Sequence, residues 1–369
     1  MQHSILPPHL TAHLAKTNPK FRSQLHQDMG IRHVRASLDS KSEPGEISVY
    51  DANSSMDLPP KKKAGQNLPQ AQRVRKWAQV TSEVMEVGDF PDGVVRYGVD
   101  YVNAFYDGQF LVFGMGDGEV FGDFTLGLDV FAHEFGHKLI DGGPRLEYFG
   151  QPGALNEHLA DVIGVSVREK EAKEGGDDSG PNWRIGAELF LDGKSALRDM
   201  KDPGTAYDNL ALGKDPQVGH MDDYEETFMD NGGVHINSGI PNRAFALFAE
   251  LVDGPVWEAP LRTWMRAANK SKPQTNFEEF AKFTIEVAGK HEDKVAKAWS
   301  ECGIEIGGST PTPAPAPAPE PDEKPEPTPS PNGDSTSEPT PEGEPESGEQ
   351  PTSEPAPEEK AKDGEDAKS

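Results

Sequence analysis

Proline and acidic side chains dominate the last sixth of this 369-residue chain, and that composition limits where a core can form. From Ser309 onward the sequence holds 16 of the 33 prolines and 16 acidic residues, against 4 basic ones. Such a segment has too few apolar side chains to offset the entropy that is lost on ordering. We therefore predict a disordered acidic Pro-rich tail at residues 309–369 and a folded part at about residues 1–308.

Charge and leader signals narrow the class of protein. The chain has a formal charge of −27, and about −15 remains on the folded part, which argues against nucleic acid and anionic membranes as partners. No uninterrupted apolar stretch is long enough to span a membrane, and the start lacks the pattern of a signal peptide. We expect a cytoplasmic monomer, with export by a non-classical route left open. The single cysteine, Cys302, excludes an intrachain disulfide and a cysteine-rich zinc site.

The apolar pattern changes along the folded part. The segments 46–52 (EISVYDA) and 110–115 (FLVFGM) predict strands, and 70–87 predicts a helix between them. From Leu126 onward the pattern is helical almost throughout. We predict an α+β fold with a sheet-rich lobe at residues 41–140 and a helical lobe at residues 141–308.

A His-Glu-x-x-His pentad at residues 133–137 is the first chemical signal. On a helix, positions four apart share a face, so His133 and His137 can direct two imidazoles at one metal ion. Glu134 is rotated by about 100° and can reach a water molecule but not the metal. With 11 histidines in the chain, the pentad alone leaves open a chance occurrence. A catalytic zinc also requires a third ligand and an open position.

Residues 153–170 (GALNEHLADVIGVSVREK) form an apolar helix that supplies this ligand. Glu157 and Asp161 share one face of it, and a carboxylate near the buried side is costly unless it is paired or binds metal. Glu157 is a natural third ligand, while Asp161 and Asn156 can accept the second N–H of each histidine. Two acids that complement the helix dipole are the alternative, but the dipole explains one acid rather than two aligned ones.

Three sequence blocks together resemble a known family. The pentad is followed twenty residues later by Glu157 in GALNEHLAD and then by DNGGVHINSGIPNRAF at 230–245. This order resembles the thermolysin family of zinc metallopeptidases over roughly residues 46–305. The resemblance implies a two-lobed thermolysin-like fold, with an active-site helix at 129–140 between the lobes. It also implies a neutral endopeptidase with one Zn²⁺ per chain that cuts peptides or proteins before bulky apolar residues.

The resemblance implies a role for each matching residue. The zinc ligands would be His133, His137 and Glu157. Glu134 would be the general base on the zinc-bound water, and Asp161 and Asn156 would orient the two histidines. Further catalytic residues would be Tyr148, His235 and Asp230, and the substrate-binding residues would be Asn103, Ala104 and Arg198.

Physical reasoning supports some of these roles. Tyr148 and His235 are donors of the kind that stabilise an oxyanion beside a metal. Without the block context, Tyr148 would be an ordinary packing tyrosine, Arg198 a surface charge and His235 a half-buried structural histidine. No family role is implied for His158 or His220, and we interpret both as structural.

The chain departs from the family at a second cation site. Relatives with a double calcium site carry acids where this sequence has Arg168, Asn182, Arg184 and Ala187. Only Asp129 keeps the corresponding acid. A lone carboxylate is a poor site for a cation that takes six to eight oxygens, so calcium binding is doubtful.

The amino end indicates a subgroup. HSILPPHLTAHLAK at residues 3–16 resembles the short propeptide of protealysin-like members of the family. This implies that residues 1–40 are an inhibitory segment that is removed on maturation, as in a zymogen. The alternative is a polar arm with an accidental Pro-Pro.

Two other functions remain open at this point. One is a catalytically silent thermolysin-like binding protein that presents the acidic tail to partners. A lost Glu134 or metal ligand would have favoured it, and all are present. The other is a protease that acts mainly on one partner protein inside the cell.

Overall fold

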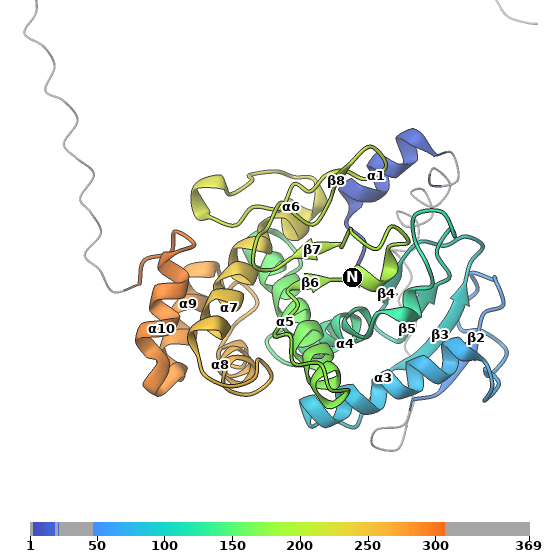
Figure 1. The fold of residues 1–369 in the computed structure, drawn as a ribbon, viewed down its shortest axis with the longest axis horizontal. Coiled ribbons are helices and arrows are strands. Elements are labelled where there is room, and N and C mark those ends of the chain that lie inside the picture. The colour runs from blue at the N-terminus through green and yellow to red at the C-terminus, as the bar shows by residue number, and fades with distance from the viewer. Residues whose placement is uncertain (1–2, 19–20, 22–46, 307–369) are drawn as a thin grey trace, which may run out of the picture. The chain divides into compact units, whose positions relative to one another are not determined.

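A five-stranded mixed sheet forms one side of the molecule (Figure 1). The structure is a computed structural model and describes residues 3–18, 21 and 47–306. The strands lie in the order β1-β4-β5-β3-β2. Their bounds are β1 His3–Ser4, β2 Val49–Asp51, β3 Asp92–Tyr97, β4 Ala104–Tyr106 and β5 Phe110–Gly114. The predicted tail and the predicted end of the propeptide near residue 40 lie outside the described residues.

The centre of this sheet follows from its apolar strands. All five residues of β5 are buried, as expected for a strand with neighbours on both sides and both faces covered. β5 pairs with β3 in parallel and with β4 in antiparallel orientation. Between β4 and β5, the Asp107 carboxylate accepts N–H bonds from Gln109 and Phe110 and fixes the turn. Strands predicted at 46–52 and 110–115 are present as β2 and β5, whereas the sequence patterns did not identify β3.

Two helices connect the sheet to the rest of the molecule. Helix α3 (Pro69–Met85) lies on β2 and β3, and α4 (Leu128–Gly142) contacts β4 and β1. The Trp77 indole N–H donates to the carbonyl of Thr125, which ties α3 to the chain that leads into α4. The first matches the predicted helix at 70–87, and the second matches the predicted active-site helix at 129–140 within two residues at each end.

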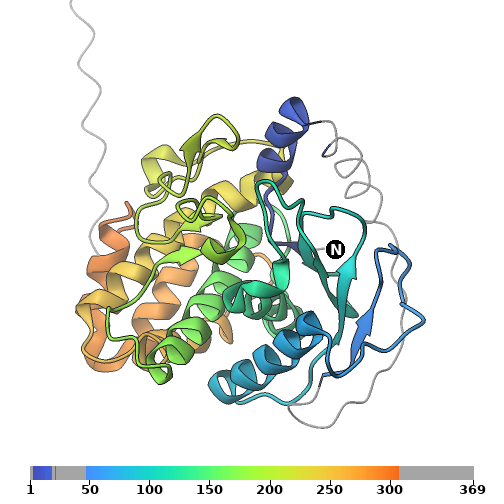
Figure 2. The same ribbon diagram turned by 45° about the vertical axis from the view of Figure 1, so that its right-hand side comes forward.

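The remaining large helices form a second lobe around one buried helix. Figure 2 shows α4 and α5 between this lobe and the sheet. The bounds are α5 Gly150–Glu174, α6 Asp230–Asn237, α7 Gly239–Leu251, α8 Ala259–Ala268, α9 Phe277–Ala288 and α10 Glu292–Ser300. Helix α5 contacts α4, α6, α7, α8 and α9. Stacked indoles of Trp264 and Trp299, 6.1 Å apart, fill the core between α8 and α10.

Glycines at two contact points allow α4 and α5 to lie very close together. A Cβ on Gly136 would meet the Cα of Ala160 at 3.0 Å, and one on Gly164 would meet the carbonyl oxygen of Asp129 at 2.8 Å. Gly136 is the fourth residue of the His-Glu-x-x-His pentad. Its missing side chain therefore sets how closely the pentad faces the carboxylates of α5.

Short elements and the amino-terminal helix complete the described chain. The short strands are β6 Arg184–Ile185, β7 Arg198–Asp199, β8 Asp208–Asn209 and β9 Gly213–Lys214, and the 3₁₀ turns are η1 Phe124–Leu126, η2 Ala187–Leu189, η3 Met221–Asp223 and η4 Gly289–His291. Helix α1 (Pro8–Thr17) lies beside β8 and β9 (Figure 1), where His9 Nε2 is 3.0 Å from the Tyr207 hydroxyl.

These elements confirm the predicted fold class. A sheet-containing first half is followed by a helical second half, and the pentad helix lies between them. Among the residues that the structure describes, no helix has both the length and the apolar character needed to cross a membrane.

Candidate active site

Three side chains from two helices converge on one small buried volume. His133 and His137 project from α4, and Glu157 faces them from α5. The two Nε2 atoms are 3.1 Å apart, and each lies 3.5 Å from a different oxygen of the Glu157 carboxylate. All three side chains are fully buried. The close contact of α4 with α5 brings together two nitrogen donors and a carboxylate donor.

The second nitrogen of each histidine has a fixed acceptor. Nδ1 of His133 lies 2.8 Å from Asp161 Oδ1, and Nδ1 of His137 lies 2.8 Å from Asn156 Oδ1. Since these oxygens accept from Nδ1–H, both Nε2 atoms carry lone pairs in the neutral rings and face each other. That arrangement is repulsive unless a cation or a proton lies between them.

The pKa of His133 reflects this demand for positive charge. Burial disfavours its charged form, but hydrogen bonds to Asp161 and Glu157 outweigh burial and raise the pKa of His133 to about 9. A metal ion bound by both Nε2 atoms would replace that proton. Burial and the nearby His3 instead hold the pKa of His137 well below its usual value. The donor set therefore fits zinc, which takes imidazole nitrogen and carboxylate oxygen.

Glu134 lies beside this cluster as a buried acid without a hydrogen bond. Among the described residues, neither of its oxygens has a hydrogen-bond partner, and Oε2 of Glu157 has none either. Burial raises the pKa of Glu134 to about 8, although nearby backbone N–H groups of Tyr106 and Ile5 favour its charged form. Buried carboxylate oxygens without partners are rare. Here they fit a site that takes up a cation and a water molecule.

Two further side chains place hydrogen-bond donors next to Glu157. The Tyr148 hydroxyl donates to Glu157 Oε1, and Nε2 of His235 lies 3.4 Å from Glu157 Oε2. Asp230 holds His235 through Nδ1 at 2.7 Å and through the backbone N–H at 2.9 Å. Burial lowers the pKa of His235, but Asp230 and Glu157 outweigh burial and raise it to about 9. The ring can therefore donate from both nitrogens at neutral pH.

Backbone conformation explains how Asp230 meets a residue five positions later. Asp230, Asn231, Gly232 and Gly233 all have positive φ angles. At Gly232 a Cβ would lie 2.8 Å from the backbone nitrogen of Gly150. The glycine pair in DNGGVHIN is therefore required for the turn itself.

A buried ion pair supports the histidine contact from behind. Arg198 donates to both oxygens of Asp161, with each distance 2.8 Å, and Asn242 donates to Oδ2 at 2.9 Å. Burial raises the pKa of Asp161, but the Arg198 charge and the His133 contact outweigh it and lower the pKa well below its usual value. Asp161 is therefore a fixed, charged partner for His133.

The amino-terminal segment occupies the edge of the sheet next to this cluster. Strand β1 pairs with β4 in antiparallel orientation. Beyond β1, the N–H of Ile5 donates to the carbonyl of Ala104 at 3.2 Å, and the N–H of Leu6 donates to Asn103 Oδ1 at 3.2 Å. The predicted substrate-binding pair therefore contacts the backbone of the chain's own amino end.

Two cationic groups contact carbonyls of the same segment. Arg198 donates from Nη1 to the carbonyl of Ile5 at 3.1 Å, and Nε2 of His235 lies 3.1 Å from the carbonyl oxygen of Ser4. The candidate site thus includes every residue that the sequence predicted for it, together with residues 4–6, which were not predicted.

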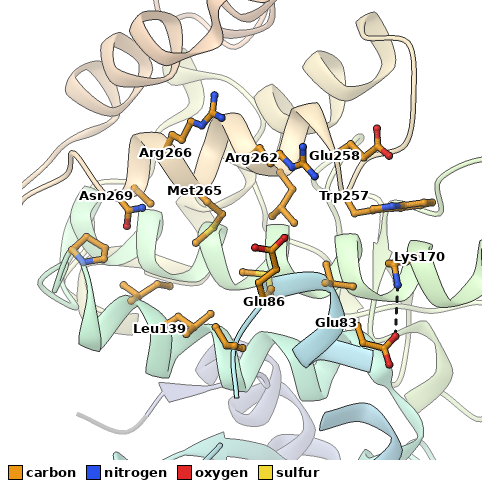
Figure 3. A pocket seen from close by; sticks show the side chains of 17 residues that line it. Glu83, Glu86, Leu139, Lys170, Trp257, Glu258, Arg262, Met265, Arg266 and Asn269 are labelled. Atoms are coloured by element: carbon orange, nitrogen blue, oxygen red, sulfur yellow. Dashed lines mark ion pairs between the residues drawn. The ribbon is translucent and has the colours of Figure 1, made fainter. Parts of the chain in front are cut away.

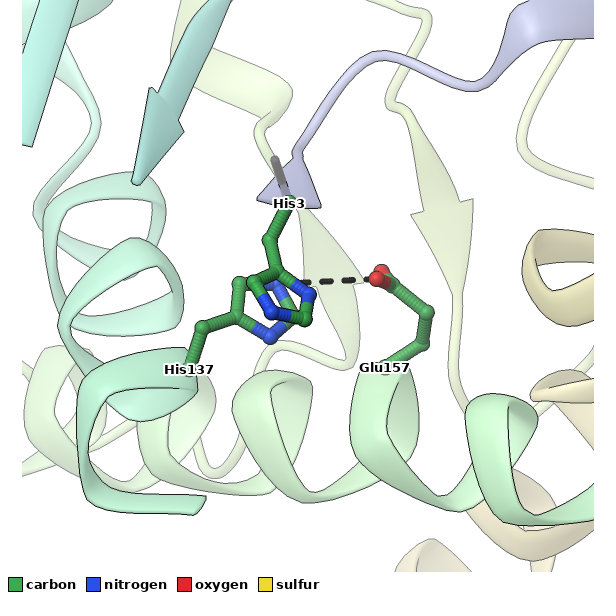
Figure 4. Close-up of side chains that lie close together, drawn as sticks. All are labelled: His3, His137 and Glu157. Carbon is green, nitrogen blue, oxygen red and sulfur yellow. Dashed lines mark ion pairs between the residues drawn. The ribbon is translucent and has the colours of Figure 1, made fainter. Parts of the chain in front are cut away.

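His3 is a further residue that sequence reasoning missed. Its ring stacks on His137 with centroids 4.2 Å apart and lies edge-on to Tyr148 at 4.5 Å. His3, His137 and Glu157 each offer a donor atom within 4.8 Å of the others (Figure 4). Nδ1 of His3 is buried without a hydrogen-bond partner in the described structure. A single histidine in a polar terminus has no spacing signal, so only the folded chain identifies it.

The histidines predicted to be structural have structural partners. His158 is fully buried, with Nδ1 2.7 Å from Asn242 Oδ1 and Nε2 accepting the Trp264 indole N–H at 2.7 Å. Burial lowers its pKa to about 4, so the ring is neutral. His220 accepts the Asp222 N–H at 3.2 Å at the start of η3.

The position of the doubtful calcium site contains an arginine. The Arg168 guanidinium donates to Asp129 and to the carbonyls of Asn182 and Arg184, and it lies 3.3 Å from Glu169 Oε1. The expectation of a lone carboxylate there was incomplete. The negative charges of Glu169 and Glu188 also act on Arg168 and, with Asp129, raise its pKa despite burial. The chain thus places its own cation among three acids.

A separate hollow of about 860 Å³ lies away from this cluster (Figure 3). Its lining includes Glu86, Leu139, Met265 and Arg262, and Lys170 pairs with Glu83 at its edge. None of the predicted site residues lines it.

Comparisons with known proteins agree with the fold and with the residue cluster. The model of the thermolysin metallopeptidase catalytic domain matches residues 81–141, and that of the thermolysin metallopeptidase alpha-helical domain matches residues 144–304. The precursor of protealysin, a metalloproteinase from Serratia proteamaculans, superimposes with a TM-score of 0.72 at 35% identity. That match covers 82% of this chain and 99% of the other.

Two curated relatives match at higher identity over a shorter stretch. An extracellular metalloprotease of Pectobacterium carotovorum is 47% identical over 223 residues, and Protease PrtS of a Photorhabdus strain is 43% identical over 223 residues. Each match covers 58% of this chain, and the chain spans 64% and 60% of the two relatives. The fold and cluster define a metallopeptidase architecture. This chain belongs to the thermolysin family, in its protealysin-like subgroup.

Proposed function

We propose that this chain is a zinc-dependent neutral endopeptidase that is made as a self-inhibited precursor. The observation that carries the proposal is the pair of facing Nε2 atoms of His133 and His137, 3.1 Å apart and beside Glu157. Family membership supports the same conclusion. One zinc ion per chain would be held by these three residues, while Asp161 and Asn156 fix the rings.

Zinc, when bound, supplies Lewis acidity that polarises the substrate carbonyl and lowers the pKa of water. Glu134 is the proton carrier in this proposal. Its carboxylate takes a proton from the attacking water and passes it to the leaving amine nitrogen. The absence of a hydrogen-bond partner for either Glu134 oxygen among the described residues supports this role, because both oxygens remain available to water and substrate.

Five neighbouring residues would bind the substrate as charge develops. Tyr148 and the cationic ring of His235 donate to the carbonyl oxygen as it becomes negative. Arg198 holds the next carbonyl along the peptide, and Asn103 with Ala104 aligns the backbone as an added strand. The contacts that His235, Arg198, Asn103 and Ala104 make to residues 4–6 support their assignment.

Cleavage on the amino side of bulky apolar residues forms part of the proposal. Arg198 donates to the backbone carbonyl of Ile5, and the Ile5 side chain is fully buried. A position that removes an entire isoleucine side chain from water favours large apolar residues, by about 1.5–3 kcal/mol for a side chain of that size.

Inhibition in the precursor follows from the same contacts. Residues 3–6 lie along the edge strand where a substrate backbone would pair. Removal of the amino-terminal segment would expose that edge. The point at which maturation cuts the chain is predicted near residue 40 and lies outside the described residues.

The test separates catalysis from metal binding. Glu134→Gln should retain about one equivalent of zinc and should lose about 10²–10⁴-fold in the hydrolysis of a quenched peptide. Glu157→Gln should instead bind zinc more weakly, because a charged ligand is lost. A matched control is Glu174→Gln, which changes an exposed acid on the same helix and should alter neither property.

The rival function predicts a different pattern. A catalytically silent binding protein would hold zinc and hydrolyse nothing, even after the amino-terminal segment is removed. Zinc content and peptide hydrolysis of the wild-type chain therefore decide between the two. If Glu134→Gln cleaves peptides as fast as wild type, the assignment of Glu134 as the general base is wrong.

A further inference from the structure

The amino-terminal segment is bound with one particular peptide bond at the centre of the site. On the two sides of the Ser4–Ile5 bond, the Ser4 carbonyl lies 3.1 Å from His235 Nε2, and the Ile5 N–H donates to the carbonyl of Ala104 at 3.2 Å. Both reacting ends of this amide therefore have a partner from the candidate site.

Contacts on the far side of this bond fix the register. The carbonyl of Ile5 accepts from Arg198 at 3.1 Å, and the N–H of Leu6 donates to Asn103 at 3.2 Å. Ile5 is 0% exposed and Leu6 is 2% exposed. Two residues after the Ser4–Ile5 bond are thus held by both backbone and side chain.

The chemical groups lie on the correct sides of the bond. His235 Nε2 contacts the Ser4 carbonyl and also lies 3.4 Å from Glu157 Oε2, which places this carbonyl beside the metal donors. On the nitrogen side, the Ile5 N–H donates to the carbonyl of Ala104, and both oxygens of the buried Glu134, which follows His133 on α4, have no hydrogen-bond partner among the described residues. Amide hydrolysis needs polarisation at the carbonyl and a proton at the nitrogen, and these two needs match the two sides.

We propose that the chain hydrolyses its own Ser4–Ile5 bond. The oxygen of one water molecule bonds to the carbonyl carbon of Ser4, the C–N bond breaks, and Glu134 delivers the water's proton to the nitrogen of Ile5. The products are a peptide that ends in the Ser4 carboxylate and a chain that begins at Ile5. The inference rests on the proposed function and deepens it, since it names a bond and the side chain that follows it.

This cut is intramolecular and does not by itself release the inhibitory segment. Helix α1 still holds the new amino end, through contacts such as that of His9 with Tyr207. Because the bond is already in place, its cleavage is a first-order process that does not depend on encounter between molecules. Maturation near residue 40 is a separate and later event, because another segment must enter the cleft.

The experiment follows the intact mass of the 369-residue chain, made without an amino-terminal tag. Zinc-free protein is mixed with zinc at protein concentrations that span about 100-fold. We expect loss of residues 1–4, with one rate constant at all concentrations. Ile5→Leu should cut within a few-fold of wild type, whereas Ile5→Asp should slow the cut at least 100-fold, because a carboxylate cannot be buried there without a partner.

Ile5→Asp could slow the cut only because the amino-terminal segment no longer docks. A second measurement tests the same bond in a separate peptide. A peptide of residues 1–10 is added to zinc-loaded protein from which the amino-terminal segment has been removed, and its products are identified by mass. The wild-type peptide should be cut between Ser4 and Ile5 and the Ile5→Asp peptide should not. If the protein hydrolyses an unrelated peptide but leaves this bond intact in both formats, the inference is overturned and the proposed function stands. A chain that hydrolyses no peptide even after its amino-terminal segment is removed overturns both.

Discussion

Helices α4 and α5 bury acidic side chains at two sites, and the buried negative charge is compensated differently at each. Near the start of α4, Asp129 meets the guanidinium of Arg168 from α5. One turn further along α4 are His133, Glu134 and His137, and Glu157 faces the two histidines from α5. Both oxygens of Glu134 and Oε2 of Glu157 have no hydrogen-bond partner among the described residues. One site contains its own permanent cation, and the other fits an exchangeable one.

The difference separates stability from chemistry. An arginine is charged at any pH that the folded chain survives, so it neutralises buried acids without an open coordination position. A metal ion also neutralises acids, and in addition it can bind water and a carbonyl oxygen. We infer that the chain uses a fixed cation where only packing is needed, and a metal where a reactive position is needed.

The largest expected effect comes from removing the arginine of the first site, where Arg168 meets Asp129. Arg168→Met leaves Asp129 buried without its partner, and removal of one member of a buried ion pair costs about 3–5 kcal/mol. Urea unfolding monitored by circular dichroism should show this loss in the free energy of unfolding. The change should leave zinc stoichiometry unaltered, because Arg168 does not contact the histidine cluster.

The control for this change lies two residues away. Lys170 makes a surface ion pair with Glu174 on the same helix, and Lys170→Met should cost less than about 1 kcal/mol. If both variants were equally stable, Arg168 would not be compensating buried charge, and the contrast between the two sites would fail.

How far the sequence predicted these two sites depends on the range of the contacts. The pentad and its facing acids were predictable because helical periodicity places His133, His137 and Glu157 on known faces. At the first site the sequence predicted that only Asp129 keeps an acid, but it did not predict that Glu169 and Glu188 also lie near Arg168. The sequence could not show that Arg168 itself fills the space, because its partner at 182 lies in a loop and its partner at 184 begins the two-residue strand β6.

The amino-terminal contacts were the least predictable part. His3 and Ser4 reach the site by pairing with β4, about a hundred residues away in the sequence. A two-residue strand has no periodicity to detect. β3 was also missed, because its residues continue a turn and its bulge interrupts the alternation of side chains.

The next effect concerns the second site. Zinc bound to the folded chain only should stabilise it by about 2.7 kcal/mol when its free concentration is 100 times the dissociation constant. Removal with a chelator should therefore lower the melting temperature, and restored zinc should recover it. In Arg168→Met the same shift in free energy should add to the loss from the mutation, since the two sites share no partner. A non-additive result would mean that the two sites are coupled through α4 and α5.

A smaller effect concerns His9, whose charge, unlike that of Arg168, depends on pH. We expect this charge to weaken the docking of the amino-terminal segment. Burial, and then repulsion from His235, lower the pKa of His9 from 6.5 to about 4 in the docked segment. The undocked segment therefore binds the proton more tightly, and docking is complete above pH 6.5 and weakens as pH falls towards 4. At pH 5.5 the loss should be about tenfold, or about 1.4 kcal/mol.

Hydrogen exchange at the amides of residues 8–17 measures this docking. Faster exchange between pH 7 and 5, after correction for the intrinsic rate, is the expected result. His9→Gln keeps a polar group near Tyr207 and should remove the pH dependence in this window. A wild-type segment whose protection is constant down to pH 4 would show that His9 is not buried in its neutral form.

The smallest expected effect tests the first site again, with calcium. Arg168 already donates to Asp129 and to the carbonyls of residues 182 and 184, so the oxygens that a calcium ion would need are engaged by a cation. Millimolar calcium added to the zinc-loaded wild-type chain should change the melting temperature by less than about one or two degrees, because stabilisation follows occupancy.

The matched experiment uses Arg168→Ala, which frees three acids and two carbonyls at the same place. A calcium-dependent rise in that variant alone would show that the guanidinium occupies a competent cation site. A rise of ten degrees in wild type would instead place calcium elsewhere in the chain and end the contrast between a fixed and an exchangeable cation.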